Sequence, residues 1–295
     1  MDWSVQDHAT FFQFSRSPFS LTSDPAFYFR SRSHGRVFDA LSLAITRRES
    51  LMLVVGDLGV GKTTLCRTLM ESRERRWRAA LVGNALVSPE DLLRLMLQDL
   101  GATPDGDPGR GQLAAAGLTD LMRQLDEFLN ALHESGDGAL LIIDEAHSLP
   151  PATLEQVIEM MNLESNRQRV LQCLLAGQPA IGGHAMLPRA ADHGLAVRTR
   201  LLPLERDECE RYVDHRLVIA GGAGVTFSQQ SIEVLYALSG GLPRLVNLLC
   251  ERALREAAAA QSKRIEAAMI SSAASALDLL RLRPKRFRWY GHILR

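Results

Sequence analysis

Three glycines, a lysine and two threonines lie close together between residues 56 and 64, where the sequence is Gly-Asp-Leu-Gly-Val-Gly-Lys-Thr-Thr. Glycines in such a turn let the backbone fold tightly, so that successive N–H groups face a single anion. Lys62 adds a positive charge for the outer phosphates of a nucleotide, and the Thr63 hydroxyl is a ligand for Mg²⁺. The spacing therefore predicts a nucleoside triphosphate site, and the alternative is a glycine-rich turn without a ligand. The predicted nucleotide-binding residues are Gly56, Asp57, Gly59, Val60, Gly61, Lys62, Thr63 and Thr64.

The choice of lysine in this loop is informative. Of the 34 basic side chains, only Lys62, Lys263 and Lys285 are lysines, so arginine serves nearly everywhere else. A lysine inside the loop therefore indicates a need for a compact ammonium, in a place that a planar guanidinium would not fit.

Two acids follow a second apolar run, Ala-Leu-Leu-Ile-Ile at 139–143. In ATPases that use such a loop, the first acid, here Asp144, holds Mg²⁺, and the second, here Glu145, polarises the attacking water. The alternative is a core strand that ends in two surface acids. Taken with the loop, the pair predicts ATP, or another nucleoside triphosphate, with Mg²⁺ as the ligand.

The elements that must position these residues are strands that alternate with helices. An apolar strand at 51–55 precedes the loop, and an amphipathic helix follows it from Lys62. Further strands are predicted at 79–82, 139–143, 170–178 and 197–204, which gives a five-stranded parallel, doubly wound α/β sheet. From residue 205 onward the periodicity is helical only. We therefore predict an ATPase core at 36–204 and a small all-helical lid at 205–280.

The first 35 residues have an unusual composition, because they contain six of the ten phenylalanines. Serine and proline separate these rings, which is typical of extended chain. We predict an extended segment at 1–35 that buries its rings on the ATPase core. An unfolded aromatic tail is the alternative, and the cost of exposing the rings to water disfavours it.

The bulk composition excludes a strong global field and favours a reducing compartment. The formal net charge is zero and the isoelectric point is about 7.1, so any attraction to nucleic acid or membrane would be local. The four cysteines are scattered without metal-type spacing, which is typical of buried free thiols. The first residues lack a signal-peptide pattern, and no apolar stretch reaches eighteen residues. These features predict a cytoplasmic chain.

Together, the loop, the acidic strand end and the helical lid resemble the AAA+ plan. An ordered series of further motifs is similar to the GspA/ExeA-type secretion ATPases: Phe-Ser-Arg-Ser-Pro-Phe at 14–19, Asp-Pro at 24–25, Ser-His at 33–34, Gly-Gln-Pro at 177–179 and Gly-Gly-Leu-Pro-Arg at 240–244. The resemblance covers about residues 11–275. It implies an oligomeric ATPase, in a ring or a filament, that serves type II secretion or pilus assembly in the bacterial envelope.

The resemblance also implies roles for single residues. Gln178 matches the polar sensor at the tip of the fourth strand, and Arg244 matches the lid arginine that reaches the γ-phosphate. Arg198 lies where AAA+ proteins supply an arginine to the neighbouring subunit's nucleotide. The family usually has a Gln-Arg pair four residues before the Arg198 position, and here the sequence at 192–194 is Asp-His-Gly. Arg200 and Arg189 therefore stay open as alternatives for the arginine finger, the arginine that one subunit supplies to its neighbour. The predicted catalytic set is Lys62, Asp144, Glu145, Gln178, Arg198 and Arg244, with Thr63 and Asp144 as Mg²⁺ ligands.

The end of the chain, 281–295, is basic and aromatic. Cations and rings in this pattern are typical of the edge of a membrane segment, so we predict a peripheral contact with the inner membrane. A solvated tail is the alternative. No membrane span follows in this sequence, in contrast to many members of the family.

Two other functions stay open on the sequence. The TnsC/TniB-type transposition ATPases share this core, so the chain could instead form ATP-dependent filaments on DNA and recruit a transposase. The arginines between 73 and 78 would then form a stripe, although the zero net charge disfavours non-specific DNA binding. The third possibility is a nucleotide-gated interaction module with weak hydrolysis.

Overall fold

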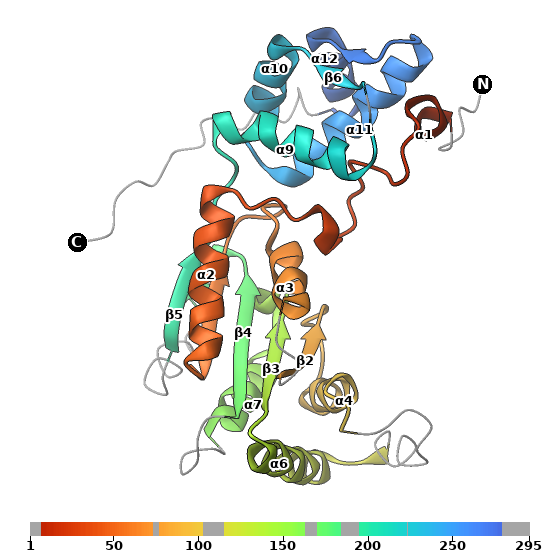
Figure 1. The fold of residues 1–295 in the computed structure, drawn as a ribbon. Helices are drawn as coiled ribbons and strands as arrows, with labels where there is room; N and C mark the ends of the chain where they lie inside the picture. Colours follow the sequence, from red (N-terminus) through yellow and green to blue (C-terminus); the bar gives the residue numbers. More distant parts are fainter. Residues whose placement is uncertain are drawn as a thin grey trace. The chain divides into compact units, whose positions relative to one another are not determined.

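A computed structural model describes residues 7–72, 77–102, 115–162, 170–183, 195–222 and 224–278. The chain divides into two compact units (Figure 1): a core unit, Ser23–Pro203, and a helical unit that combines Met1–Thr22 with Leu204–Arg295. Each unit is described by itself. Several predictions fall outside the described residues, namely the tail at 281–295, the altered segment at 192–194, Arg189, and the arginines Arg73, Arg75 and Arg76.

The core unit is built on one five-stranded sheet in which every pairing is parallel. The strand order is β2-β3-β4-β1-β5. The strands are β1 Leu51–Val55, β2 Trp77–Val82, β3 Gly138–Ile143, β4 Leu171–Gly177 and β5 Leu195–Arg200. The predicted α/β fold with a five-stranded parallel sheet is therefore confirmed.

The strands β1, β3 and β4 are buried along their whole length, which is typical of strands covered on both faces of a parallel sheet. In the register of these strands, Val55 of β1 lies opposite Gly177 of β4, and Ile143 of β3 lies opposite Leu175 of β4. Because parallel strands run in the same direction, the residues that follow β1, β3 and β4 emerge at one edge of the sheet.

Two groups of helices cover the sheet. The helices α2 (Arg32–Thr46) and α3 (Lys62–Glu71) contact each other, and α4 (Pro89–Asp99) contacts both α6 (Leu118–Ser135) and α7 (Pro151–Asn162). Figure 1 shows α2 in front of the sheet and α7 behind it. Serines cap α2 and α4, because the Ser31 and Ser88 side chains accept from backbone N–H groups of the first turn.

The helical unit contains α9 (Arg206–Ile219), α10 (Gln229–Ser239), α11 (Pro243–Ala259) and α12 (Ala267–Ala276). A purely helical unit was predicted, but the structure also contains a short parallel pair of strands, β6 (Thr226–Phe227) and β7 (Arg264–Ile265). Two-residue strands leave no alternating pattern in a sequence, which explains the omission. None of the helices in the described part of the chain is long and apolar enough to cross a membrane.

The N-terminal segment differs from its prediction. Residues 7–22, here called the N-terminal strap, belong to the helical unit and not to the core unit. They begin with a short helix, α1 (Asp7–Phe12), which lies against α11, where His8 Nε2 is 3.2 Å from Glu251 Oε1. The rings of Phe12 and Phe19 are buried as expected, but within the helical unit.

A buried arginine of α9 explains why the strap is held there. The Arg216 side chain is 6% exposed and donates to the carbonyl oxygen of Pro18, to that of Ser20 at 3.3 Å and to the Tyr212 hydroxyl at 3.0 Å. A buried guanidinium requires such acceptors, because desolvation without them costs several kcal/mol. Pro18 and Arg216 lie far apart in the sequence, so no local pattern could predict their contact.

We therefore expect Arg216→Met to destabilise the helical unit by about 3 kcal/mol, because it removes charge-assisted hydrogen bonds and leaves carbonyl oxygens unpaired. Urea unfolding would measure the loss. Within the described part of the chain, the exposed Arg211 on the same helix pairs with Asp207 alone, so Arg211→Ala should cost less than about 0.5 kcal/mol. Trypsin should also cleave Arg216→Met faster after Arg16 in the strap. Equal stability and cleavage in both variants would contradict the role of Arg216.

Candidate active site

The glycine-rich loop leaves the carboxyl end of β1 and closes without room for side chains. A Cβ on Gly56 would lie 2.8 Å from Val60 Cγ1 and 3.0 Å from the carbonyl oxygen of Leu201. Gly61 has φ +105°, and a Cβ there would lie 2.9 Å from His34 Nε2. A backbone turn of this kind before a helix N-terminus is suited to phosphate, which approaches closer than any side chain would allow.

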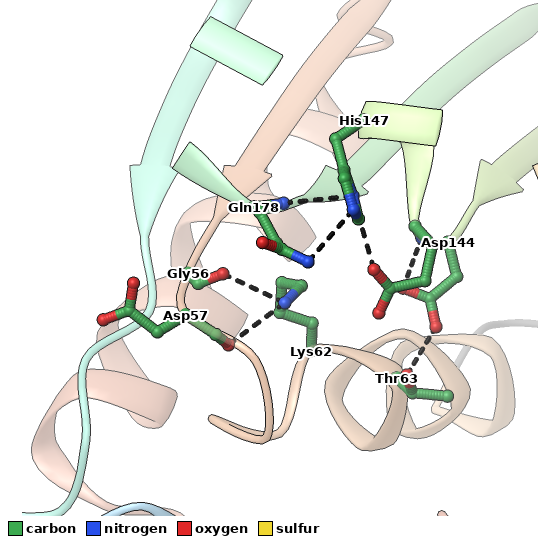
Figure 2. Close-up of polar contacts among 8 residues, drawn as sticks. Gly56, Asp57, Lys62, Thr63, Asp144, His147 and Gln178 are labelled. Carbon is green, nitrogen blue, oxygen red and sulfur yellow. Dashed lines mark hydrogen bonds and ion pairs between the residues drawn. The ribbon is translucent and has the colours of Figure 1, made fainter. Parts of the chain in front are cut away.

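Lys62 is the first residue of α3 and is 4% exposed. Its ammonium donates to the carbonyl oxygens of Gly56 at 3.0 Å and Asp57 at 3.2 Å (Figure 2). These carbonyls satisfy a buried charge that would otherwise be costly. The ammonium therefore lies inside the curve of the loop, against the carbonyl oxygens at its start. Thr64, also predicted to bind nucleotide, lies half-buried in the first turn of α3.

The next residue, Thr63, joins the loop to the acids. Its hydroxyl donates to Asp144 Oδ2, while Asp144 Oδ1 accepts from the backbone N–H of Glu145 at 2.9 Å. Asp144 is 3% exposed, so this carboxylate is held in one orientation by both contacts. A hydroxyl and a carboxylate are hard oxygen donors of the kind that Mg²⁺ prefers. The two predicted metal ligands therefore fit the ion.

Glu145 follows Asp144 in a left-handed backbone conformation, with φ 51° and ψ 33°. This region is unfavourable for a residue with a side chain, and such strain collects at functional sites. The Glu145 side chain is 36% exposed, whereas Asp144 is buried. One acid is therefore fixed beside Thr63, and the other can meet water.

A thiol near these groups takes no part as a nucleophile. Cys66 lies one turn along α3 from Lys62 and is fully buried. Burial raises the pKa of the Cys66 thiol far above its ordinary value, and the charge of Asp144 raises it further. Because the thiolate is the reactive form, Cys66 stays inert at neutral pH.

His147, for which the sequence predicted no role, lies between two predicted site residues, Glu145 and Gln178 (Figure 2). His147 Nδ1 is 3.3 Å from Glu145 Oε2, and His147 Nε2 is 3.0 Å from the side-chain nitrogen of Gln178. The signal that could have found it is its place: a titratable residue two positions after the second acid. Gln178 itself follows β4, as its predicted sensor position requires.

His34 is a second residue without a role in the sequence analysis, although it forms part of one quoted motif. It is 5% exposed in α2, where its Nε2 lies 3.0 Å from the carbonyl oxygen of Val60 and its Nδ1 2.7 Å from Ser31 Oγ. The histidine thus ties the glycine-rich loop to the start of α2. His34 and Val60 are 26 positions apart in the sequence, so no local pattern indicates this contact.

The two predicted arginines belong to different units, Arg198 to the core unit and Arg244 to the helical unit. Arg198 is exposed on β5, opposite Leu53, and Arg200 is exposed one pleat closer to the carboxyl end of the sheet, opposite Val55. Arg244 is exposed in the first turn of α11, in the helical unit. A cation near the N-terminus of a helix interacts unfavourably with the helix dipole. The local structure therefore does not explain why an arginine occupies this position.

Comparison with known proteins agrees with this geometry. A family model described as an AAA domain matches residues 45–182, which contain the loop and both acids. General secretion pathway protein A of Aeromonas hydrophila is 32% identical over 269 residues. The chain is a relative of the GspA-type AAA ATPases. The match covers 90% of this chain and 48% of the A. hydrophila protein, so the chain spans about half the length of that relative.

Solved structures show the same fold at lower sequence identity. The Aeropyrum pernix ORC2 protein, determined as ADPNP-ADP complexes, is 16% identical with a TM-score of 0.67, covering 89% of this chain and 72% of that one. Drosophila ORC bound to DNA is 14% identical with a TM-score of 0.64, covering 94% and 69%. These likenesses confirm the predicted AAA+ fold.

The contact of His34 leads to a prediction about the loop itself. His34→Ala should leave the Val60 carbonyl without this partner, so that backbone amides at 57–61 exchange hydrogen about tenfold faster. Hydrogen exchange followed by mass spectrometry would measure this without any ligand. His34→Gln, whose amide can reach the place of Nε2, is the matched control and should restore most of the protection. Unchanged exchange in His34→Ala would show that the loop is held by other contacts.

Proposed function

We propose that this protein binds ATP with Mg²⁺ and hydrolyses it, as an oligomeric motor or switch in the assembly of envelope machinery of the type II secretion or pilus kind. One observation carries the enzymatic part: Lys62, Thr63, Asp144 and Glu145 meet at one edge of the sheet. The similarity to General secretion pathway protein A supports the envelope part.

The chemistry follows from the separate roles of these side chains. A water oxygen attacks the γ-phosphorus, the bond from that phosphorus to the bridging oxygen of ADP breaks, and the carboxylate of Glu145 takes the water proton. Lys62 exchanges its carbonyl partners for phosphate oxygens as the nucleotide binds. Thr63 and Asp144 hold Mg²⁺, which neutralises charge on the phosphates when bound. Phosphate and ADP then leave.

The proposed partners rest on the relative, and the relative is about twice as long as the matched region. We propose a second copy of this chain and a component of a secretion or pilus machine. A cytoplasmic location with peripheral contact at the inner membrane follows from this assignment, and the contact through residues 281–295 stays a prediction.

The DNA-binding alternative, with a transposase as partner, also stays a prediction. Most of the arginines on which it depends lie outside the described residues, and only Arg78 of that run belongs to β2. The exposed β5 arginines could serve a protein neighbour as well as DNA, so they do not separate the two functions.

Two substitutions separate binding from turnover and test the proposed activity. Lys62→Ala should weaken ATP binding at least about tenfold, measured by calorimetry, because the loop loses its ammonium. Glu145→Gln should bind ATP as the unchanged protein does, while turnover falls by roughly two orders of magnitude, because an amide cannot accept the proton. Arg67→Ala, an exposed position on α3, is the control and should change neither. An unaltered ATP affinity in Lys62→Ala would contradict the assignment of the glycine-rich loop as the phosphate-binding site.

We also propose that full activity requires a neighbouring subunit's arginine, and Arg198 is our first candidate. The phosphoryl transition state spreads charge over the γ-phosphate oxygens, and an added arginine there is worth about 10³-fold or more. Lys62 is already committed to the loop, and Arg198 is exposed on β5, an edge strand of the described sheet.

A mixing experiment tests this requirement. Lys62→Ala keeps Arg198 but cannot hold ATP, and Arg198→Ala holds ATP but offers no finger. Each should be nearly inactive alone, while mixtures should recover ATPase activity that rises with protein concentration. The same mixture made with Arg200→Ala shows whether the neighbouring arginine serves instead. Wild-type activity of Arg198→Ala alone, independent of concentration, would disprove the role of Arg198.

A further inference from the structure

We propose that His147 is a positioning residue that couples Gln178 to the carboxylate of Glu145, so that the Gln178 amide keeps the base aligned for turnover. This inference rests on the proposed ATPase function. In the proposed chemistry His147 touches neither phosphate nor metal. It lies between the amide of Gln178, at the predicted sensor position, and the proposed base Glu145.

The imidazole of His147 is in contact with both partners at once. Its Nδ1 is 3.3 Å from Glu145 Oε2, and its Nε2 is 3.0 Å from Gln178 Nε2 (Figure 2). The backbone nitrogen of Gln178 is 3.5 Å from Nδ1, and its N–H donates there only in the tautomer that carries the ring proton on Nε2. The ring therefore spans the gap between the residues that follow β3 and β4, two neighbouring strands of the sheet.

The backbone around His147 is built for this close approach. His147 lies in the short helix η2 (Ala146–Ser148), directly beside the end of β4. A Cβ on Gly177 would lie 3.2 Å from the His147 backbone nitrogen, so a side chain at that position would push the two segments apart. Ala146 is buried, and the Ser148 N–H donates to the Glu145 carbonyl oxygen at 2.9 Å, which holds the turn in place.

Hydrogen-bond chemistry then fixes what the ring can do. A neutral imidazole carries one donor and one acceptor. When Gln178 Nε2 donates to His147 Nε2, the proton of the ring is on Nδ1 and is donated to Glu145 Oε2. The second oxygen of the Glu145 carboxylate remains available to take a proton from water. Without the Gln178 amide as a donor, this tautomer loses its support, and Glu145 is released from its orientation.

The geometry matters because, among the described residues, His147 is the one that restrains the Glu145 carboxylate. Its backbone N–H is tied to Asp144, but its side chain is 36% exposed and can adopt other rotamers in water. Misplacement of a catalytic group by about 1 Å can cost roughly 10²-fold in rate. A side chain that holds the carboxylate thus affects turnover far more than binding.

The first experiment compares kcat with KM in the full-length protein. His147→Ala should lower kcat by about tenfold to a hundredfold, while KM and ATP affinity stay within about twofold. In the Glu145→Gln background, His147→Ala should have no further effect on kcat, because the group it positions can no longer act. A histidine that serves only the stability of η2 would lower kcat by the same factor in both backgrounds, and that result would overturn the proposal.

Two conservative variants separate the two contacts. The amide nitrogen of asparagine takes the place of Nδ1, so His147→Asn should recover kcat to within about threefold of wild type. The amide of glutamine takes the place of Nε2, so His147→Gln should stay as slow as His147→Ala. The reverse order of recovery would show that the contact with Gln178, and not the one with Glu145, sets the rate. That order would contradict the positioning role.

A double-mutant cycle tests the coupling to Gln178. If the two residues act as one unit, the kcat loss of His147→Ala with Gln178→Ala should be smaller than the product of the single losses. A multiplicative loss would refute the coupling. Should His147→Ala fail to fold, His147→Gln carries the cycle in its place. Failure of the inference is distinct from failure of the proposed function, because Lys62-dependent hydrolysis would persist in the first case and be missing from the wild type in the second.

Discussion

The candidate site depends on the parallel register of three buried strands. Because β1, β4 and β3 pair with Val55 opposite Gly177 and Ile143 opposite Leu175, the loop, the acids and Gln178 all begin at one edge of the sheet. Stability and chemistry are therefore separated along each strand. The strands contribute buried apolar surface, and the residues that directly follow them carry charge and polar groups that would be costly inside.

Local signals explain why so much of this arrangement could be predicted from the sequence. The glycine spacing before Lys62 and the two acids after residue 143 are contiguous patterns, and each follows an apolar run of strand length. Parallel pairing then follows from alternation with helices, since a crossover of that length permits little else. The close approach of Thr63 and Asp144 depends also on the order of the strands, which the structure supplied.

Contacts between distant segments account for what the sequence could not show. The strap was expected on the core because its rings had to be buried, and burial was correct, but hydrophobicity does not specify a partner. Arg216 specifies it through carbonyl groups of the strap, and carbonyl groups are present in every residue. His34 and His147 are similar cases. Each acts through a neighbour that only the folded sheet and helices bring within hydrogen-bond distance.

The path of the chain adds a final constraint on the glycine-rich loop. Two segments of the core unit contact this loop or each other: the start of α2, with Ser33 and His34, and the residues after β5, with Leu201 and Leu202. Ser33 Oγ accepts from the Leu202 backbone N–H at 2.9 Å, so the two segments are bonded to each other. His34 bonds the loop from one of them, and the Leu201 carbonyl lies where a side chain on Gly56 would be. The backbone of the glycine-rich loop is therefore packed against two segments of the core unit that are far apart in the sequence, and a substitution in either segment changes the shape of the loop.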